Sequence, residues 1–522
     1  MTRVQNVNQT DIPDAIRLAT RTMQNVFDAD DNNTPFFHSL VRPTANLEFF
    51  FSFSEAHVPG RHLNALLNAE DAIGVEIPDW AIENHARAAF YSYSGPVALP
   101  LNRDRIGGTL KRFLPHNLRE GFHALYALSA FRDSAEAQGI AERSIADIDR
   151  YWNEDDGWDR ATLEGKYGLD VIEWGGPFIT GIARAIGPLV KYYKSTGSPA
   201  ARALIDRLAE KTVADYFTVD GSFDYSRWGS HTHSTTCVMS SLAQLAALDG
   251  NDAMLERVAI FYDNGLRFIS DELGWSIEKC SPEANSDRGE ANNTGDILET
   301  ALILGHMRDP KYFQDAERIL RGHLLPSQLR DVSWIVDPPN PEGVDGLRDV
   351  ANRHLGAFGF PAPYGHAPLD YEEIRFNMDI VGGATGSLCE AWRATVREVD
   401  GTTRINMLFD YDDDTIRVES PYLSGVLRIT PGLPRPVAVR LPSWVDADAA
   451  VAAVPGSSFD TIGRWLRIDS PTPGKTIAIP MPLVEETIVL KHRARDIGTR
   501  LSGDSVVAMD NFGADLTFFP AI

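Results

Sequence analysis

Residues 235–250 read TTCVMSSLAQLAALDG, a pattern that is decisive for the fold class. Its apolar residues recur at intervals of three and four, which places them on one face of an α-helix; they are Val238, Leu242, Leu245 and Leu248. The stretch ends in Gly250, and glycine commonly terminates helices. It therefore predicts an amphipathic helix that ends at Gly250.

The same pattern recurs from about residue 60 to residue 395. Segments 62–74 (HLNALLNAEDAIG) and 118–139 (LREGFHALYALSAFRDSAEAQG) also carry helical apolar spacing and end in glycine. Long loops rich in Gly, Pro, Trp and Asp lie between the helices, for example residues 153–178. This alternation is typical of stacked helical hairpins and predicts a helical toroid. The first ~50 residues fit no clear period and could pack on either domain.

After about residue 400 the apolar residues alternate with polar ones. Segments such as 414–420 (DTIRVES) and 425–431 (GVLRITP) have the period of two that half-buried strands show, and Pro/Gly turns separate them. Several short strands of this kind predict a β-sandwich. We place the boundary near Val399–Thr402, which gives a helical domain at 1–399 and a β-sandwich domain at 400–522.

Charge and composition limit the class of protein. The chain has 49 basic and 73 acidic residues, a net charge of −24, so nucleic acid and anionic membranes are not expected partners. The N-terminus lacks a secretory signal pattern, and no apolar run approaches the ~18 residues of a membrane span. Three widely spaced cysteines fit a reducing compartment. We expect a cytoplasmic protein; the sequence does not determine its oligomeric state.

Two glutamates flank a polar loop in residues 282–300, PEANSDRGEANNTGDILET. Glu283 lies in the loop, whereas Glu299 falls among the apolar residues of the following helix. A carboxylate in apolar surroundings must be paired or protonated, because an unpartnered buried charge is costly. Such a pair suits acid/base chemistry on a sugar. The alternative is that Glu299 is a structural helix residue and Glu283 a solvated one.

Four segments resemble, in order and spacing, the β-L-arabinofuranosidase-like glycoside hydrolases, family 127 and its relatives. These segments are HVPGRHLNALLNAEDAIG (57–74), WSIEKCSPEANSDRGEANNTGDILETALILGH (275–306), GGATGSLCEAW (382–392) and VAVRLPSWVDADAAV (437–451). The resemblance extends over most of the chain, from about residue 55 to about residue 490. It implies a carbohydrate substrate and hydrolysis of a glycosidic bond.

The resemblance also implies roles for individual residues. In the family a loop glutamate is the general acid/base, and a second glutamate, in the helix that follows, opens a zinc-binding Glu-Thr-Cys motif; Glu283 and Glu299 have the separation of that pair. His231 matches a substrate-binding histidine that precedes the acid/base. The nucleophile of the family belongs to an adjacent, zinc-bound Cys-Cys pair, and the corresponding segment here is Ser387-Leu388-Cys389-Glu390, in which Leu388 or Glu390 replaces one cysteine and Cys389 matches either the nucleophile or the zinc ligand.

The sequence departs from this zinc pattern at two positions. Ala301 stands where the third residue of Glu-Thr-Cys would be, and only one cysteine of the pair remains. A tetrahedral zinc site needs four ligands, so zinc is possible but disfavoured, and we expect no metal or other cofactor. Without a nearby cation the Cys389 thiol is a weak nucleophile. Cys389 is therefore either the nucleophile or an inert buried residue.

Other residues are candidates for a second carboxylate or for substrate binding. If two carboxylates do the chemistry, the second is one of Glu299, Glu290, Asp296 and Asp379. His231 and His233 form a His-x-His, for which hydrogen bonding is favoured over metal binding. The proposed substrate-binding residues are His231, His233 and Glu290, together with three others. Trp174 and Tyr364 are aromatic residues in loops, which suit stacking on a sugar ring. Arg61 is either a contact to an acidic sugar or a helix cap.

We therefore expect an (α/α)6 helical toroid followed by a C-terminal β-sandwich, mainly α with a β domain. The expected activity is that of a glycosidase, exo-acting on a furanoside or another non-reducing-end sugar, with Glu283, Glu299 and Cys389 as catalytic candidates. One alternative is a lyase acting on uronic-acid sugars, which the same toroid supports. Another is an inactive carbohydrate-binding protein, as the incomplete zinc motif would suggest.

Overall fold

Six helices form a closed inner ring in the computed structural model, which describes residues 2–281, 286–369, 371–491 and 494–522. Each inner helix packs against the next, and the last packs against the first. They are α2 (Val58–Ile73), α4 (Leu118–Arg132), α8 (Ile186–Thr196), α11 (Thr232–Asp249), α13 (Ala291–Met307) and α16 (Met378–Thr395). Neighbouring inner helices run parallel to each other, so all six begin at the same end of the ring.

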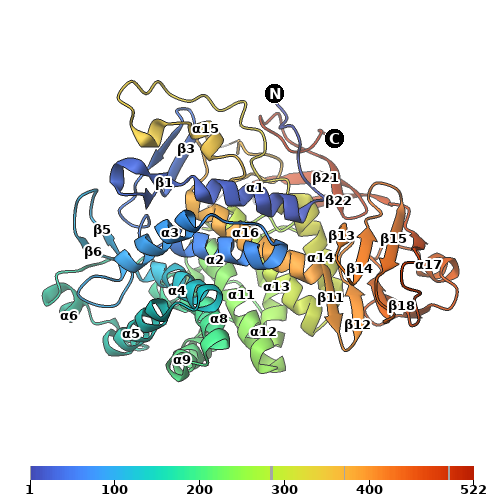
Figure 1. Cartoon of the computed structure of the whole chain (residues 1–522), viewed down its shortest axis with the longest axis horizontal. Coiled ribbons are helices and arrows are strands. Elements are labelled where there is room, and N and C mark those ends of the chain that lie inside the picture. The colour runs from blue at the N-terminus through green and yellow to red at the C-terminus, as the bar shows by residue number, and fades with distance from the viewer. Residues whose placement is uncertain (1, 282–285, 370, 492–493) are drawn as a thin grey trace.

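An outer helix packs on each inner helix. The outer layer consists of α3 (Asp79–Ser92), α5 (Ala135–Tyr151), α9 (Pro199–Asp215), α12 (Asp252–Asp263), α14 (Lys311–Ile319) and α1 (Ile12–Gln24). The helix α1 comes from the N-terminus and packs on α16, the last helix of the ring, so these two helices form its sixth hairpin although they lie far apart in sequence (Figure 1). The predicted (α/α)6 toroid is confirmed, and the ambiguous N-terminal segment belongs to it.

Glycines end two of the predicted helices where expected. Gly74 and Gly250 adopt left-handed φ values of 63° and 61° and cap α2 and α11. The prediction of one helix over 118–139 is wrong. Asp133 takes a left-handed conformation and ends α4, and the Ser134 side chain accepts a hydrogen bond from the Ala137 amide, which starts α5. Capping chemistry thus overrides the helical apolar spacing.

Short strands and helices lie mainly in the loops that lead into the inner helices. The strands are β1 (Phe27–Asp28), β2 (Thr34–Pro35), β3 (His38–Arg42), β4 (Asn46–Glu48), β5 (Leu101–Arg103), β6 (Leu110–Phe113), β7 (Trp152–Asn153), β8 (Gly157–Trp158), β9 (Asp170–Val171) and β10 (Ile374–Arg375). The short helices are α6 (Arg160–Gly165), α7 (Pro177–Thr180), α10 (Tyr225–Trp228) and α15 (Val350–Arg353).

Two facing sheets follow α16. One has the order β11-β12-β16-β18-β17 and the other β13-β14-β15-β19. Their bounds are β11 (Val396–Val399), β12 (Thr402–Ile405), β13 (Tyr411–Asp412), β14 (Ile416–Glu419), β15 (Val426–Pro431), β16 (Val437–Arg440), β17 (Ser458–Asp460), β18 (Trp465–Ile468) and β19 (Ile477–Pro480), with α17 (Ala447–Ala453) between β16 and β17. Burial alternates along β15 as predicted, with Leu427 and Ile429 inside. This region is the predicted β-sandwich.

The last three strands pack against the toroid instead. They are β20 (Glu485–Lys491), β21 (Asp496–Ser502) and β22 (Ser505–Met509). The sandwich has its own apolar core between Val396 and Met481, whereas Leu501 and Val506 belong to the core of the helices. The predicted division at 399/400 stays a prediction.

The two ends of the chain meet, since the Val4 amide donates to the Thr517 carbonyl (3.1 Å). Within the described ranges, every helix is too short or too polar for a membrane span.

Candidate active site

Polar residues gather where the six inner helices begin, an end of the ring that we call the mouth. His57, His231 and Glu290 immediately precede α2, α11 and α13, and Asn117 and Asn377 immediately precede α4 and α16. Helix N-termini carry partial positive charge and free amide groups. A ring of six parallel helices therefore concentrates these groups around one axis.

A buried carboxylate, Glu120, holds the centre of the mouth together. Its Oε1 atom accepts from Arg184 (2.9 Å) and lies 3.0 Å from Arg61 and 3.3 Å from Arg119. His57 Nδ1 lies 3.4 Å from the other carboxylate oxygen. Burial would raise the pKa of the Glu120 carboxyl, but the charges of Arg184, His57, Arg61 and Arg119 outweigh it and hold that pKa well below 4.5. Glu120 is thus a permanent anion.

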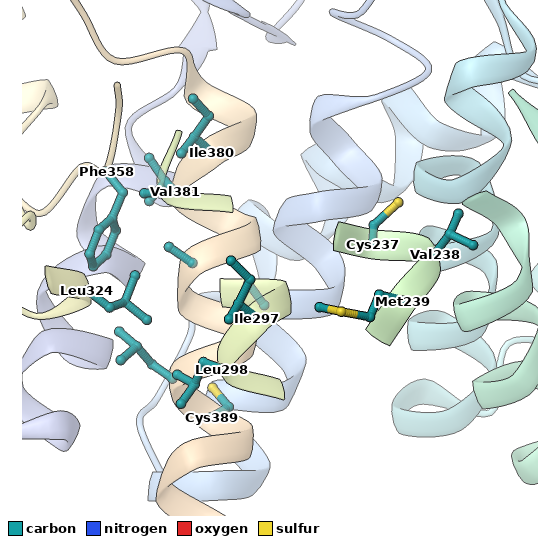
Figure 2. Close-up of a cluster of buried hydrophobic side chains, with 14 of the residues drawn as sticks. Cys237, Val238, Met239, Ile297, Leu298, Leu324, Phe358, Ile380, Val381 and Cys389 are labelled. Atoms are coloured by element: carbon teal, nitrogen blue, oxygen red, sulfur yellow. The ribbon is translucent and has the colours of Figure 1, made fainter. Parts of the chain in front are cut away.

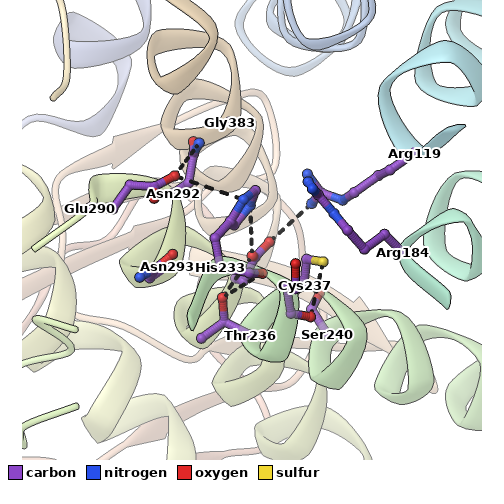
Figure 3. A network of polar contacts seen from close by, with 12 residues as sticks. Arg119, Arg184, His233, Thr236, Cys237, Ser240, Glu290, Asn292, Asn293 and Gly383 are labelled. Carbon is purple, nitrogen blue, oxygen red and sulfur yellow. Dashed lines mark hydrogen bonds and ion pairs between the residues drawn. The ribbon is translucent and has the colours of Figure 1, made fainter. Parts of the chain in front are cut away.

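A chain of contacts runs from Glu290 at the mouth into the axis of the ring (Figure 3). His233 lies 3.8 Å from the Glu290 carboxylate and 3.4 Å from that of Asp296. Asp296 in turn accepts from Arg119 (3.1 Å) and from the Thr236 hydroxyl (3.1 Å). Burial, followed by the charge of Arg61, lowers the pKa of His233 well below 6.5, so its imidazole is neutral.

Glu290 has the properties of a carboxylic acid that stays protonated at neutral pH. It is 7% exposed and accepts a hydrogen bond from Asn292 Nδ2 (3.1 Å). Burial, followed by the negative charges of Asp379 and Glu278, raises its pKa from 4.5 to about 8. A raised pKa of this kind marks candidate acid/base residues.

Asp379 supplies a second carboxyl group at the mouth. It lies in the first turn of α16, and its Oδ2 atom is 3.2 Å from His57 Nε2. Its Oδ1 atom is buried and has no hydrogen-bond partner among the described residues, and the same holds for Asn292 Oδ1. Unsatisfied buried oxygens are costly. They indicate that a water molecule or a substrate hydroxyl completes the site.

Aromatic rings form one wall of the mouth. Trp174 is 36% exposed, and its ring lies 4.4 Å from that of His116 and 5.7 Å from that of His231. His116 stacks in parallel on His57 at 5.7 Å. An exposed indole beside buried polar groups offers a flat apolar face to a sugar ring.

The structure brings only some of the predicted site residues together. Glu290, His231, His233, Trp174 and Arg61 lie at the mouth, and Arg61 is engaged by Glu120 and by His233 (3.0 Å). Glu283 lies outside the described residues. Tyr364 is buried between the loop that precedes α13 and the C-terminal segment: its hydroxyl donates to Asp287 Oδ2 (2.7 Å), and its carbonyl accepts from the Phe518 amide.

Glu299 and Cys389 lie deeper in the ring. Glu299 is nine residues beyond Glu290 on α13, roughly 13 Å along the helix axis. Its carboxylate accepts from the hydroxyls of Ser240 and Ser387 (2.9 Å each). Cys389 lies in the apolar core with Leu298 (Figure 2), and burial raises the pKa of its thiol to about 12. A thiol in such surroundings is a poor nucleophile.

The zinc ion implied by the family resemblance does not fit these surroundings. Glu299 faces two serine hydroxyls, which are poor zinc ligands compared with thiolates. Over the described ranges, His, Cys, Asp and Glu side chains form no group of three or more that could hold a metal. No step of the chemistry proposed below involves zinc.

Sequence reasoning missed the residues that organise the mouth. His57, His116, Glu120 and Arg184 were not singled out, although all four are buried. A weak signal exists: His57 precedes Arg61 by one helical turn, and His116 precedes Glu120 by the same spacing, each pair at the start of a largely apolar inner helix. Charged residues one turn apart in a buried helix must find partners across the axis.

Known structures share this architecture. A family 127 β-arabinofuranosidase has a TM-score of 0.59 at 12% identity, covering 94% of this chain and 78% of its own. A family 127 β-L-arabinofuranosidase from Geobacillus stearothermophilus T6 has a TM-score of 0.53 at 13% identity, covering 95% and 80%. A sugar epimerase from a ruminal bacterium has a TM-score of 0.53 at 12% identity, covering 73% and 99%.

Sequence comparisons add no closer relative: no protein-family model matches, and no curated protein is significantly similar. TM-scores of 0.53–0.59 show a common fold, and at identities of 12–13% they show the fold alone. The resemblance to family 127 seen in the sequence is thus confirmed for the architecture, and this chain has the (α/α)6 toroid and β-rich C-terminal region of those glycoside hydrolases.

Proposed function

We propose that this protein is a glycoside hydrolase in which Glu290 is the general acid. The observation that carries the proposal is the pairing of a buried carboxylic acid of raised pKa, about 8, with a second carboxyl group, Asp379, at the mouth of the toroid. Glycosidases use one protonated and one ionised carboxyl group on opposite sides of the scissile bond. The fold of the family 127 enzymes supports the same class of reaction.

In the proposed reaction each residue of the mouth has a separate role. Glu290 donates its proton to the glycosidic oxygen as the bond to the anomeric carbon breaks, while Asp379 stabilises the positive charge that develops on the sugar. Water then adds to the anomeric carbon, and one of its protons returns to the Glu290 carboxylate, which restores the acid. His57 fixes the Asp379 carboxylate, and the Trp174 ring carries one face of the sugar. Glu120 and its arginines keep the mouth rigid, because each partner is buried and ion-paired.

A β-L-arabinofuranoside is the first substrate to test, since two structural neighbours are β-arabinofuranosidases. The exo mode and the furanoside preference belong to the proposal. In this scheme Glu290 takes the acid role that the family resemblance assigned to Glu283. Both residues lie in the segment that leads into α13, so direct comparison of their variants separates the two assignments.

Hydrolysis of nitrophenyl glycosides by wild-type protein and matched variants tests the acid. Glu290→Gln should lower kcat/KM by ~10²–10⁴-fold, because the amide keeps the shape but has no proton to donate. Glu342→Gln, an exposed change of the same type, should have no effect. A fully active Glu290→Gln protein would refute the assignment; an inactive Glu283→Gln protein beside it would move the acid role to Glu283.

A sugar epimerase is the second candidate. It is favoured by the neutral imidazoles of His116, His231 and His233, which could move protons. It is also favoured by the fold of the sugar epimerase, 99% of whose chain is covered by the match with this one. Reaction in D2O separates the two. An epimerase breaks a C–H bond and forms a C–D bond at a sugar carbon without cleaving a glycosidic bond, whereas a hydrolase releases free sugar without carbon-bound deuterium.

The uronate lyase remains the weakest of the expected activities. It needs a cation to neutralise the uronate, and Arg61, the residue suggested for that role, is already paired with Glu120. Its product, an unsaturated sugar, would absorb in the near ultraviolet in the same assays. Sugar binding without any turnover would instead indicate the inactive carbohydrate-binding protein.

A further inference from the structure

A second cavity lies at the end of the toroid opposite the mouth. Its volume is about 850 Å³, within the range of pockets that bind small molecules. The C-terminal halves of five inner helices line it, with residues such as Tyr126 on α4, Lys191 on α8, Gln244 on α11, His306 on α13 and Glu390 on α16. Since the inner helices are parallel, this cavity and the mouth are at opposite ends of the ring.

The cavity is positively charged although the protein is strongly acidic. Four cations line it against two carboxylates, a formal charge of +2 in a chain whose net charge is −24; the cations are Lys191, Lys194, Arg393 and Arg397, and the carboxylates Glu299 and Glu390. Arg393 is already ion-paired with Glu390 (3.1 Å) and with Asp71 (2.5 Å), so the cations available to a ligand are Lys191, Lys194 and Arg397. Burial lowers the pKa of His306 to about 4, and the charges of Arg397 and Arg404 add to that effect, so His306 is neutral there. A cationic basin of this kind attracts anions.

Helix ends account for only part of this charge. Lys194 and Arg393 lie in the last turns of α8 and α16, where cations stabilise the helix dipole. Lys191 lies in the middle of α8, and Arg397 belongs to strand β11. These two cations therefore have no role at a helix end.

Lys191 is the best-placed group for a ligand. It is half-buried, and in the described part of the chain its ammonium has no hydrogen-bond or ion-pair partner; its nearest aromatic contact is Tyr126, at 5.9 Å. The side chain also lines a small inner cavity that contains Arg119, Asp296 and Glu299. The negative charges of Glu299 and Glu390 favour its charged form. Because none of the described side chains forms a hydrogen bond with this ammonium, its N–H groups at the floor of a wide cavity can bind an anionic group.

We propose that this rear cavity is a second binding site, which takes an organic anion of the size of a sugar acid or a sugar phosphate. The anionic group binds Lys191 and the rim cations Lys194 and Arg397. The body of the ligand packs on the apolar side chains of Leu302 and Ile303, which also line the cavity. The proposal concerns binding only and holds whether or not the protein is a hydrolase.

Isothermal titration calorimetry at low ionic strength tests it, with glucuronate, glucose 6-phosphate and neutral glucose as probes. We expect at least one anion to bind and glucose not to bind, and salt should weaken the binding. Comparison of the Kd values of glucuronate and glucose 6-phosphate shows whether the site prefers a carboxylate or a phosphate. Glucose binding that the rear-cavity variants weaken as strongly as they weaken anion binding, or no binding by either anion, would refute the site.

Charge variants locate the binding. Lys191→Met should weaken the anion about tenfold or more, the usual effect of losing a charge-assisted hydrogen bond. A substitution of the half-buried Lys191 could also disturb folding, so variants of two exposed cations at the rim, Lys194→Glu and Arg397→Glu, provide a second test. Both should weaken anion binding as well. Lys475→Glu, an exposed change on the sandwich, matches them in charge and should have little effect.

Glu290→Gln at the mouth should bind the anion with unchanged affinity. Unaltered affinity in all the rear-cavity variants, with a loss in Glu290→Gln, would place the anion in the mouth and overturn the proposal.

Discussion

The protonation of Glu290 is the most consequential property of a single residue in this protein. In an unfolded chain the group has its ordinary pKa of 4.5, whereas burial raises the folded-state pKa to about 8. The folded state therefore binds the proton more tightly. Stability from this group is complete below about pH 4.5 and is lost as the pH rises to about 8.

Glu290→Gln should remove this pH dependence. The free energy of unfolding of the variant, relative to wild type, should rise by roughly 3–5 kcal/mol between pH 4.5 and pH 8.5, because the amide has no proton to lose. Urea unfolding at both pH values measures it, with Glu342→Gln as the control. A constant difference between variant and wild type would show that Glu290 titrates normally. The same raised pKa predicts that activity falls above about pH 8.

Cys389 is expected to be inert, as its apolar surroundings and high thiol pKa indicate. Cys389→Ala should retain most of the wild-type kcat and lose about 1 kcal/mol of stability, the effect of removing one small buried group. Steady-state kinetics and thermal unfolding of the variant measure both. A folded variant without turnover would restore Cys389 as the nucleophile.

At the scale of elements, glycines allow the inner helices to approach closely. A Cβ atom at Gly60 would lie 1.7 Å from the Glu120 carbonyl oxygen, and one at Gly382 would lie 2.7 Å from the Arg61 carbonyl oxygen. Both contacts are with backbone, which cannot move aside as a side chain can. The contacts α2–α4 and α2–α16 therefore depend on these glycines. Those two contacts in turn set the positions of Arg61 and Glu120.

Gly382→Ala should destabilise the protein by about 1–3 kcal/mol through this overlap. Gly386→Ala is a matched control on the same helix, since its nearest contact is the end of the Asn64 side chain at 3.2 Å. The control should change stability by less than about 1 kcal/mol, because the gain in helix propensity offsets a small adjustment. Denaturant unfolding compares the two. Equal effects would show that the α2–α16 approach is not limiting.

At the scale of the whole molecule, a buried ionic cluster joins the toroid to the sandwich. Glu317 on α14 pairs with Arg321 (3.1 Å) and with Arg440 on β16 (2.8 Å), and it accepts from the Leu408 amide (3.2 Å). Arg321 also lies over the rings of Phe409 and Tyr422 at 3.9 and 3.6 Å. Since every charged group in this cluster is buried, the two parts should behave as one unit in solution.

Glu317→Gln should weaken this docking by about 3–5 kcal/mol, because it leaves two buried arginines without their partner. Calorimetry should show one unfolding transition for wild type and a broader or split transition for the variant. Limited proteolysis should release no fragment beginning near residue 400 from wild type. Arg467→Gln, which breaks an exposed pair with Asp469 (3.8 Å), serves as the control. Early release of that fragment from wild type would contradict tight docking.

Periodicity along the sequence was sufficient for the architecture. Spacing of three and four from Val238 to Leu248, and alternation from Val426 to Pro431, report which face of each element is buried. The side of a helix or strand that is buried carries its apolar residues, so the spacing of apolar residues in the sequence is enough to identify that side. The division of residues 118–139 into two helices escaped this logic, because the left-handed Asp133 and the Ser134 cap decide it.

The mouth could be predicted only in part. The sequence indicated that a carboxylate such as Glu299 needs partners, and the structure supplies the Ser240 and Ser387 hydroxyls. It indicated Glu290 and Asp379 only as two of several carboxyl groups. It did not indicate Glu120, whose partners Arg61 and Arg184 lie on other helices, far from it in sequence.

Closure of the ring is what brings these groups together. His57 and Asp379 meet because α2, the first helix of the ring along the chain, packs against α16, the last. Burial among these charges then raises the Glu290 pKa, and no residue near it in sequence produces that shift alone. The sequence by itself determined the helices, the strands and the need to pair buried charge. Only the tertiary structure decided which charges pair, because Coulomb energies and desolvation depend on distances that the closed ring sets.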